Sequence, residues 1–314
     1  MSLAFTFPGQ GSQSVGMLSA LGDHYQSVEE TFTEAADVLG VDLWSIVRDG
    51  PEDALNQTEI TQPAMLAAGF AIWRVWKSEG GPDPRFMAGH SLGEYTALLC
   101  AEALDYPSAL RLVAERARLM QSAVPSGVGA MAAVLGLADE VVEQACIEAA
   151  ELGVGVVEPV NYNAPGQVVI AGRSAAVDAA IERAKAHGAK RAVPLPVSVP
   201  SHCSLMSPAA EALAERLETT HIRRPKVPVI HNVDAASHSE PEAIRDVLAR
   251  QVFSPVQWVH SIRRLATHGV GVVVEAGPGK VLSNLARRID RGLRPVPIFD
   301  PDSLVIGLRE VAVA

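Results

Sequence analysis

The sequence has little cysteine and no excess of basic charge. Three cysteines, Cys100, Cys146 and Cys203, occur among 314 residues. So sparse and odd a count favours a reducing compartment over a disulfide framework. Acidic residues outnumber basic ones by 36 to 26, which gives a formal net charge of −10. We therefore expect no nucleic-acid partner, because phosphate binding needs a basic face.

Long apolar runs are also missing. No stretch of the sequence is long enough to span a bilayer. The opening segment, MSLAFTFPGQGSQ, lacks the basic and long apolar regions of a signal peptide. Hydrophobic residues nevertheless make up 48% of the chain, which is enough to bury a large core. We expect a globular cytoplasmic protein that does not enter a membrane.

Short apolar runs alternate with helical patterns in both end regions of the chain. Strands are predicted over Leu3–Phe7, Arg85–Gly89, Val229–Ile230 and Gly271–Glu275. Helices are predicted over Tyr25–Leu39, Pro63–Ser78, Leu92–Ala101, Pro107–Ala123, Leu205–Leu217, Ile244–Gln251, Val256–His268 and Val281–Ile289. This alternation indicates an α/β-hydrolase-like core, with a mostly parallel sheet covered by helices. The tail after Arg291 has no clear pattern.

The middle of the chain has a different order of elements. Between residues 127 and 196 the pattern is β-α-β-β-α-β, which is typical of a ferredoxin-like unit. We interpret this region as an inserted subdomain with hinges near Ser126 and Pro196. Residues 1–126 and 197–314 would then form one catalytic core.

The stretch GHSLG places Ser91 between two glycines, after a predicted strand and before a predicted helix. This is the pattern of a nucleophile elbow, in which small neighbours let strand and helix approach and the turn exposes the hydroxyl. The N–H of Leu92, at the start of the helix, could stabilise an oxyanion. The alternative is a serine in an ordinary tight turn.

A serine nucleophile needs a base, and nine histidines are available. His202 lies in an irregular segment just before a predicted helix, where bases are often found. His90 adjoins the serine, but neighbours in a turn point apart. No carboxylate takes the hydrolase position between serine and histidine, since Asp234 and Glu275 both follow His202. A carbonyl or amide group is the alternative orienting partner.

Other motifs give weaker signals. The pair Gly9 and Gly11 begins a dinucleotide fingerprint, but Ser14 stands where the third glycine is needed. The segment EAGPGKV lacks the first glycine and the Ser/Thr of a phosphate loop. A thiol nucleophile at Cys203 is a further alternative. No His/Cys spacing is typical of zinc, so we expect neither a metal nor a cofactor.

Seven segments together point to one family. They are FPGQGSQ, GHSLGEY, ERARLMQ, VNYNAPGQVVIAG, VSVPSHCSLM, RQVFSPVQW and EAGPGKVL. With these segments in this order, essentially the whole chain resembles the malonyl-CoA:acyl carrier protein transacylases of fatty-acid synthesis.

The resemblance implies catalytic roles for five residues. Ser91 would be the acylated nucleophile, and His202 would be its general base and later its general acid. Gln10 would form the oxyanion hole beside the N–H of Leu92. Gln251 would orient the histidine through its main-chain carbonyl, which would replace the missing carboxylate.

Four more residues would bind the substrate by the same resemblance. Arg116 would pair with the malonyl carboxylate, although an arginine on a helix is more commonly solvated or paired with a neighbour such as Glu115. Asn161, Asn163 and Ser201 match positions that line the family's cleft.

The resemblance implies transfer of a malonyl group from malonyl-CoA to the phosphopantetheine thiol of acyl carrier protein, through a malonyl-serine. We expect a monomer, and docking of the acidic carrier protein on Lys190–Arg191, Arg223–Arg224 or Arg287–Arg288, each of which could equally be a solvated face. A serine esterase or thioesterase, a transferase of another extender unit and a non-catalytic carrier-docking module are the alternatives.

Overall fold

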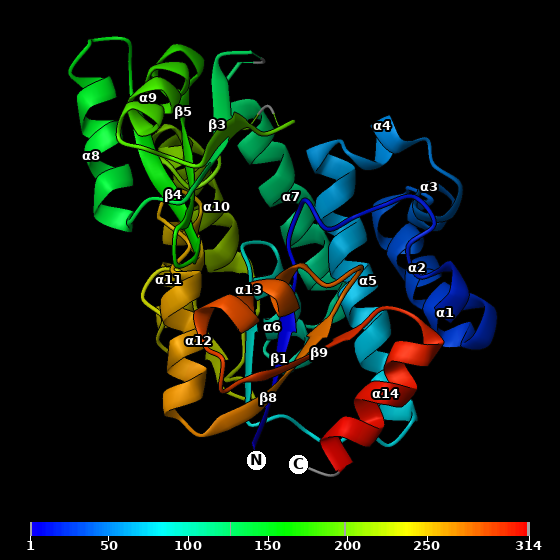
Figure 1. Cartoon of the computed structure of the whole chain (residues 1–314). Coiled ribbons are helices and arrows are strands. Elements are labelled where there is room, and N and C mark those ends of the chain that lie inside the picture. The colour runs from blue at the N-terminus through cyan, green and yellow to red at the C-terminus, as the bar shows by residue number, and fades with distance from the viewer. Residues whose placement is uncertain (1, 126, 198, 313–314) are drawn as a thin grey trace.

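The computed structural model describes residues 2–125, 127–197 and 199–312, so the predicted hinge residue Ser126 lies outside the described residues. Its strands form a five-stranded sheet and a separate four-stranded sheet. Helices surround the larger sheet, and the smaller sheet lies above it with its own two helices (Figure 1). This mixed α/β architecture confirms the predicted fold class.

The larger sheet is parallel throughout. Its order is β7 (Val229–Ile230), β2 (Phe86–Gly89), β1 (Ser2–Phe7), β8 (Val270–Ala276) and β9 (Arg294–Ile298). Residues of β1 alternate between two hydrophobic clusters, with Leu3, Phe5 and Phe7 in one and Ala4 in the other. Because both faces are covered, the central strands consist of nearly unbroken apolar residues.

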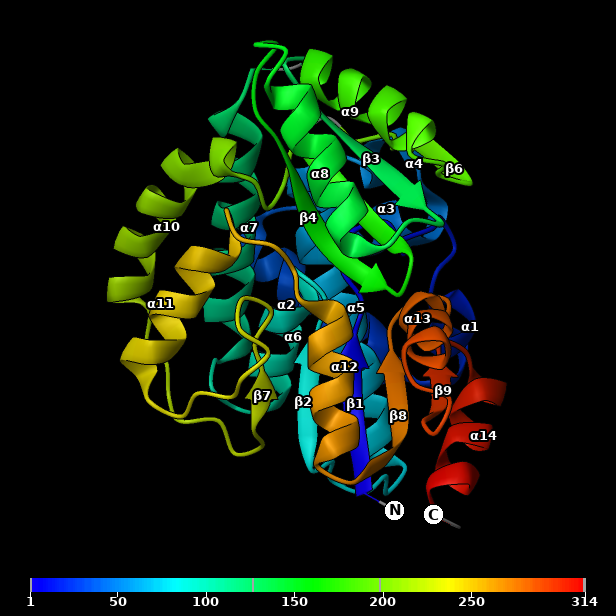
Figure 2. The ribbon, with the colours of Figure 1, turned by 60° about the vertical axis from the view of Figure 1, so that its left-hand side comes forward.

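Helices cover both faces of this sheet. In Figure 2, α12 lies in front of β1 and β2, and α5 lies behind them. The helices of this part are α1 (Ser19–His24), α2 (Gln26–Leu39), α3 (Leu43–Asp49), α4 (Glu52–Leu55), α5 (Thr58–Ser78), α6 (Gly93–Cys100), α7 (Tyr106–Ala123), α10 (Ser207–Thr219), α11 (Pro241–Gln251), α12 (Trp258–Thr267), α13 (Val281–Ile289) and α14 (Pro301–Ala312). In the described residues, no helix combines the length and the apolar character that a bilayer crossing needs.

The smaller sheet contains the middle of the chain. Its elements follow the order β3 (Gly129–Leu135), α8 (Asp139–Ala150), β4 (Val157–Ala164), β5 (Gln167–Arg173), α9 (Ser174–Ala186) and β6 (Arg191–Pro194). All neighbours in the spatial order β4-β5-β3-β6 are antiparallel, as in a ferredoxin-like unit. These elements fall within 127–196, and the division of the chain into two domains at those bounds stays a prediction.

The structure differs from the predicted elements in several places. The sequence patterns did not predict the short helices α1, α3 and α4. Helix α5 begins at Thr58, five residues before Pro63, because packing that buries Thr58, Thr61 and Gln62 outweighs the preference of proline for a first turn. The tail after Arg291 contains β9 and α14. The sequence pattern did not predict β9, because this strand contains two prolines, which only an edge strand tolerates.

Candidate active site

Ser91 lies in the turn between β2 and α6, at the carboxyl end of the parallel sheet. Its φ of 51° is in the left-handed region. A Cβ atom at Gly89 would lie 1.9 Å from the carbonyl carbon of Gly93, and one at Gly93 would lie 2.0 Å from the carbonyl oxygen of Phe7. Glycine is therefore required at both positions for strand and helix to approach this closely.

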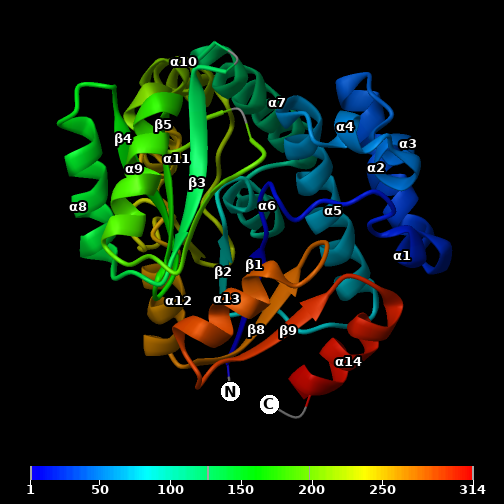
Figure 3. The same ribbon diagram turned by 45° about the horizontal axis from the view of Figure 1, so that its top comes forward.

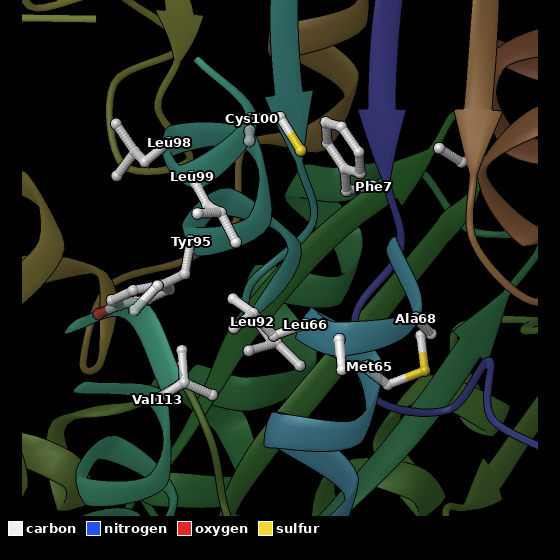
Figure 4. Packing of buried hydrophobic residues seen from close by; sticks show 14 of the residues in the cluster. Phe7, Met65, Leu66, Ala68, Leu92, Tyr95, Leu98, Leu99, Cys100 and Val113 are labelled. Carbon is white, nitrogen blue, oxygen red and sulfur yellow. The ribbon is translucent and has the colours of Figure 1, made fainter. Parts of the chain in front are cut away.

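The helix that follows is embedded in the core. All eight residues of α6 are buried. Figure 4 shows Leu92, Tyr95 and Leu99 among side chains from α5, including Met65 and Leu66. The turn that carries Ser91 is therefore built on rigid packing, and its hydroxyl is aimed by the fold.

His202 meets Ser91 across 111 residues of sequence. Its Nε2 lies 2.7 Å from the Ser91 Oγ, and its Nδ1 lies 2.7 Å from the main-chain oxygen of Gln251. Because a carbonyl oxygen can only accept, Nδ1 carries the hydrogen and Nε2 is free to accept the serine proton. The two predicted residues are therefore together in the geometry that proton abstraction needs.

The surroundings keep His202 neutral. Burial, and then the positive charge of Arg116, lower the pKa of His202 to about 3. Both carboxylates considered as acid partners are engaged elsewhere: Asp234 accepts from His238, and Glu275 accepts from main-chain N–H groups at the start of α13. The imidazole is thus oriented by a carbonyl and available as a base near neutral pH.

Arg116 is buried beside the nucleophile, with 1% of its surface exposed. Its Nη2 donates to the Ser91 Oγ at 3.1 Å and to the Gln251 Oε1 at 2.9 Å, and its Nη1 donates to the Gln62 Oε1 at 2.7 Å. Among the described residues, no carboxylate lies within 4.0 Å of the guanidinium. Burial lowers the pKa of Arg116. The side chain is therefore a buried cation with no contacting counter-charge in the described part of the chain, and not a solvated arginine.

The two hydrogen-bond donors predicted for an oxyanion hole, the Leu92 N–H and the Gln10 amide, both belong to residues of the cleft. The N–H of Leu92 has no acceptor among the described residues, and Leu92 and Gln10 line the same cleft as Ser91. The loop that carries Gln10 lies against the elbow, since a Cβ atom at Gly9 would lie 2.5 Å from the His90 carbonyl oxygen. The Gln10 Nε2 has one long contact, 3.4 Å to the Thr58 Oγ1, so it can turn toward a ligand.

A cleft of about 450 Å³ contains these groups. Most of its lining comes from the part of the chain with the parallel sheet, and Met131 and Asn161 come from the smaller sheet. Figure 3 shows α6 between β3 on one side and α5 and α7 on the other. An acyl-thioester chain entering here would meet Ser91 between the two sheets.

Three of the four predicted substrate residues line the cleft, and one does not. Arg116, Asn161 and Ser201 line the cleft, and the Oδ1 of Asn161 has no partner among the described residues. Asn163 is not part of the described lining, and its Oδ1 accepts from the Nε2 of His90 at 2.7 Å.

Sequence reasoning missed three buried polar residues at the site. Gln62 accepts from Arg116, Glu94 accepts from Gln251, and Asn232 accepts from the main-chain N–H of Ser91. Glu94 could have been found, because it lies in the serine motif and a glutamate in an otherwise apolar helix is unusual. The other two gave no signal.

The described residues give no support for two other chemistries. Among residues 2–125, 127–197 and 199–312, no group of three or more His, Cys, Asp and Glu side chains could hold a metal ion. Cys203 is buried, its Sγ contacts the Pro200 oxygen at 3.1 Å, and burial raises the pKa of its thiol to about 12. A thiol so placed is a poor nucleophile.

A serine hydroxyl on an elbow, a neutral histidine on that hydroxyl and free donors beside it define a serine enzyme of acyl transfer. The comparisons agree. Residues 4–297 match the family described as the acyl transferase domain. The chain belongs to this acyl transferase family and is an acyltransferase.

One relative compared by sequence and two solved structures are similar to this chain over almost their whole length. The chain is 52% identical over 305 residues to the malonyl CoA-acyl carrier protein transacylase of Escherichia coli K12, covering 97% of this chain and 98% of that protein. It superposes with a TM-score of 0.95 and 52% identity on an acyl carrier protein S-malonyltransferase from Vibrio cholerae, covering 98% and 100% of the two chains. It also superposes, with a TM-score of 0.97 and 51% identity over 99% and 100%, on a malonyl-transacylase solved in complex with its type II PKS acyl-carrier protein.

Proposed function

We propose that this acyltransferase moves a malonyl group from malonyl-CoA to the phosphopantetheine thiol of acyl carrier protein, with Ser91 as the nucleophile. The observation that carries the proposal is the 2.7 Å contact between Ser91 and His202 beside the buried Arg116. The names of the relatives support the same reaction. Acyl carrier protein is the partner of such an enzyme, as in the solved complex.

The first half-reaction acylates the serine. As the Ser91 Oγ attacks the thioester carbon, its proton passes to the Nε2 of His202. The N–H of Leu92 and the amide of Gln10 would donate to the oxyanion, and each preorganised donor contributes about 3 kcal/mol. The carbon–sulfur bond then breaks, CoA leaves with the proton from the imidazolium, and malonyl-Ser91 remains.

The second half-reaction reverses these roles. The carrier thiol gives its proton to His202, and its sulfur attacks the malonyl ester. The bond from the carbonyl carbon to Oγ breaks, and Oγ regains the proton. The kinetics should be ping-pong, since CoA must leave before the carrier thiol can enter.

Arg116 selects the acyl group in this proposal. A guanidinium binds a carboxylate through two parallel hydrogen bonds. A malonyl group supplies the carboxylate that Arg116 lacks, whereas an acetyl group would leave the buried cation unpaired. Asn161 and Ser201 would contact the rest of the substrate from the cleft wall.

Further parts of the proposal concern the protein's setting. We propose a cytoplasmic monomer that serves fatty-acid synthesis and uses no cofactor. The three cysteines are free thiols, which favours a reducing compartment. Docking of the carrier protein on one of the exposed pairs Lys190–Arg191, Arg223–Arg224 or Arg287–Arg288 fits the charge of an acidic partner.

Labelling of the serine tests the function. Wild-type protein incubated with malonyl-CoA should gain one malonyl group, detected by intact-protein mass spectrometry, and should lose it when carrier protein is added. Ser91→Ala should gain none, while the exposed serine control Ser122→Ala should be labelled normally. Persistent labelling of Ser91→Ala refutes the nucleophile. Loss of the label to water without carrier protein indicates a hydrolase, and an unlabelled wild type indicates a docking module.

A further inference from the structure

Two buried amide side chains hold the peptide groups on the two sides of Ser91. The main-chain N–H of Ser91 donates to the Oδ1 of Asn232 at 2.7 Å. The main-chain oxygen of Ser91 accepts from the Nε2 of Gln251 at 2.9 Å. Neither amide has any exposed surface. The backbone of the nucleophile is therefore held on both sides by residues that are not part of the described cleft lining.

Asn232 ties the elbow at two points. Its Nδ2 donates to the main-chain oxygen of Gly89 at 2.7 Å, while its Oδ1 holds Ser91. The sheet explains its position: Ala88 of β2 pairs with Ile230 of β7, so the residues that follow the two strands lie side by side. One side chain thus connects the end of the strand with the nucleophile.

A buried carboxylate contacts both residues, Asn232 through its main chain and Gln251 through its side chain. The Oε2 of Glu94 accepts from the main-chain N–H of Asn232 at 2.9 Å and from the Nε2 of Gln251 at 2.8 Å. Its Oε1 accepts from the Nδ1 of His231 at 2.7 Å. Because the Oε1 of Gln251 accepts from Arg116, the amide of Gln251 can only be oriented with its nitrogen toward Glu94. Glu94 and Arg116 therefore fix which way the Gln251 amide faces, and Glu94 also holds the backbone of Asn232.

We infer that Asn232, anchored by Glu94, is a positioning residue that holds Ser91 in the left-handed conformation from which its Oγ reaches His202. A left-handed backbone is unfavourable for a serine and persists only where the surroundings impose it. Asn232 is not part of the described cleft lining, so it would act on the rate through Ser91 and not through substrate contact. The inference rests on the proposed role of Ser91.

The Asn232→Ala variant tests the positioning role of Asn232. Without the acceptor, the Ser91 N–H is buried and unsatisfied, the turn relaxes, and Oγ moves relative to His202. Since a displacement of about 1 Å can slow a reaction about 100-fold, we expect acylation by malonyl-CoA to slow by about 10- to 100-fold. KM should change little. Pre-steady-state labelling at several malonyl-CoA concentrations measures both quantities, and circular dichroism checks folding.

Glu275→Gln is the matched control. Glu275 is equally buried and also accepts two main-chain N–H groups, but these belong to Leu282 and Ser283 of α13. The control should melt at a lower temperature and still acylate at the wild-type rate, because a purely structural loss does not reach Ser91. An Asn232→Ala protein that is folded and acylates at the wild-type rate overturns the inference.

Asn232→Asp supplies a second variant with a distinct signature. A protonated aspartic acid can still accept from Ser91 and donate to Gly89, whereas the carboxylate repels the Gly89 oxygen. The titratable and charged groups around position 232 are Glu94, His231 and, beyond Gln251, Arg116, and the pair Asp234 and His238 lies against His231. The acylation rate should fall as pH rises and recover as pH falls, with wild type measured in parallel.

These outcomes are separable from failure of the proposed function. If wild type is not labelled at Ser91, the proposed function fails before Asn232 is tested. If wild type is labelled and the Asn232→Asp rate follows pH as wild type does, the positioning role is wrong.

Discussion

The sharpest prediction concerns Arg116→Ala and the choice between malonyl and acetyl groups. Arg116 has 1% of its surface exposed and no carboxylate contact among the described residues. A carboxylate bound to it would form two charge-assisted hydrogen bonds, each contributing about 1.5–3 kcal/mol. Removing one partner of a buried pair costs about 3–5 kcal/mol. At about 1.4 kcal/mol per factor of ten, kcat/KM for malonyl-CoA should fall by about two to four orders of magnitude.

The ratio of kcat/KM values for malonyl-CoA and acetyl-CoA is the decisive measurement. Arg116 also donates to the Ser91 Oγ at 3.1 Å, and losing that contact affects both substrates. The ratio of the two kcat/KM values is unaffected by the loss of that contact, and it should fall at least about 100-fold. Arg118→Ala is the matched control, since this arginine of the same helix is 56% exposed and paired with Glu115 at 2.7 Å. An Arg116→Ala enzyme that keeps the wild-type ratio refutes the role of Arg116 as carboxylate site.

Three further predictions follow from burial. Burial and then Arg116 lower the pKa of His202 to about 3, whereas an unfolded histidine titrates at about 6.5. The free energy of unfolding should therefore decrease as pH falls from about 6.5 toward 3. Denaturant titrations of wild type and His202→Gln should show a weaker pH dependence in the variant. Iodoacetamide should leave the native enzyme active, because all three cysteines are buried and burial raises the pKa of each thiol; inactivation under native conditions contradicts this. Gly93→Ala should lower stability by about 1–3 kcal/mol or more, because its methyl group would lie 2.0 Å from the Phe7 oxygen; an unchanged melting temperature counts against the close approach.

The sequence predicted the parts of the fold that depend on local patterns. β1 and β2 are apolar runs followed by glycine, and the β-α-β-β-α-β order of the smaller sheet is readable because each helix is amphipathic and each strand is short. It did not predict β9, whose prolines are tolerated only because the strand is at the edge of the sheet. Edge position is a property of the assembled sheet and leaves no local signal.

The residues of the site also differ in whether a local pattern could predict them. The glycines around Ser91 have a local steric cause, so the elbow could be predicted from five residues. His202 and Gln251 are placed by contacts across 111 and 160 residues of sequence. The irregular segment before a helix made His202 one candidate among nine histidines, and only a resemblance to a family indicated Gln251. Asn232 and Gln62 are buried amides whose roles depend on which polar atom faces them after folding. No spacing rule encodes such a contact.

The site also explains why a carbonyl can replace the carboxylate of a hydrolase triad. A carbonyl orients the Nδ1–H of His202 without adding negative charge, so burial, and then the positive charge of Arg116, lower the pKa of the imidazole. A carboxylate bound to Arg116 would offset part of that positive charge and so raise the pKa of His202 when the correct acyl group is present. The leaving group and the second nucleophile are thiols, whose pKa is about 8.5. They therefore need less help from a base than an alcohol does. In this arrangement, recognition of the acyl group and strength of the base are coupled through one arginine.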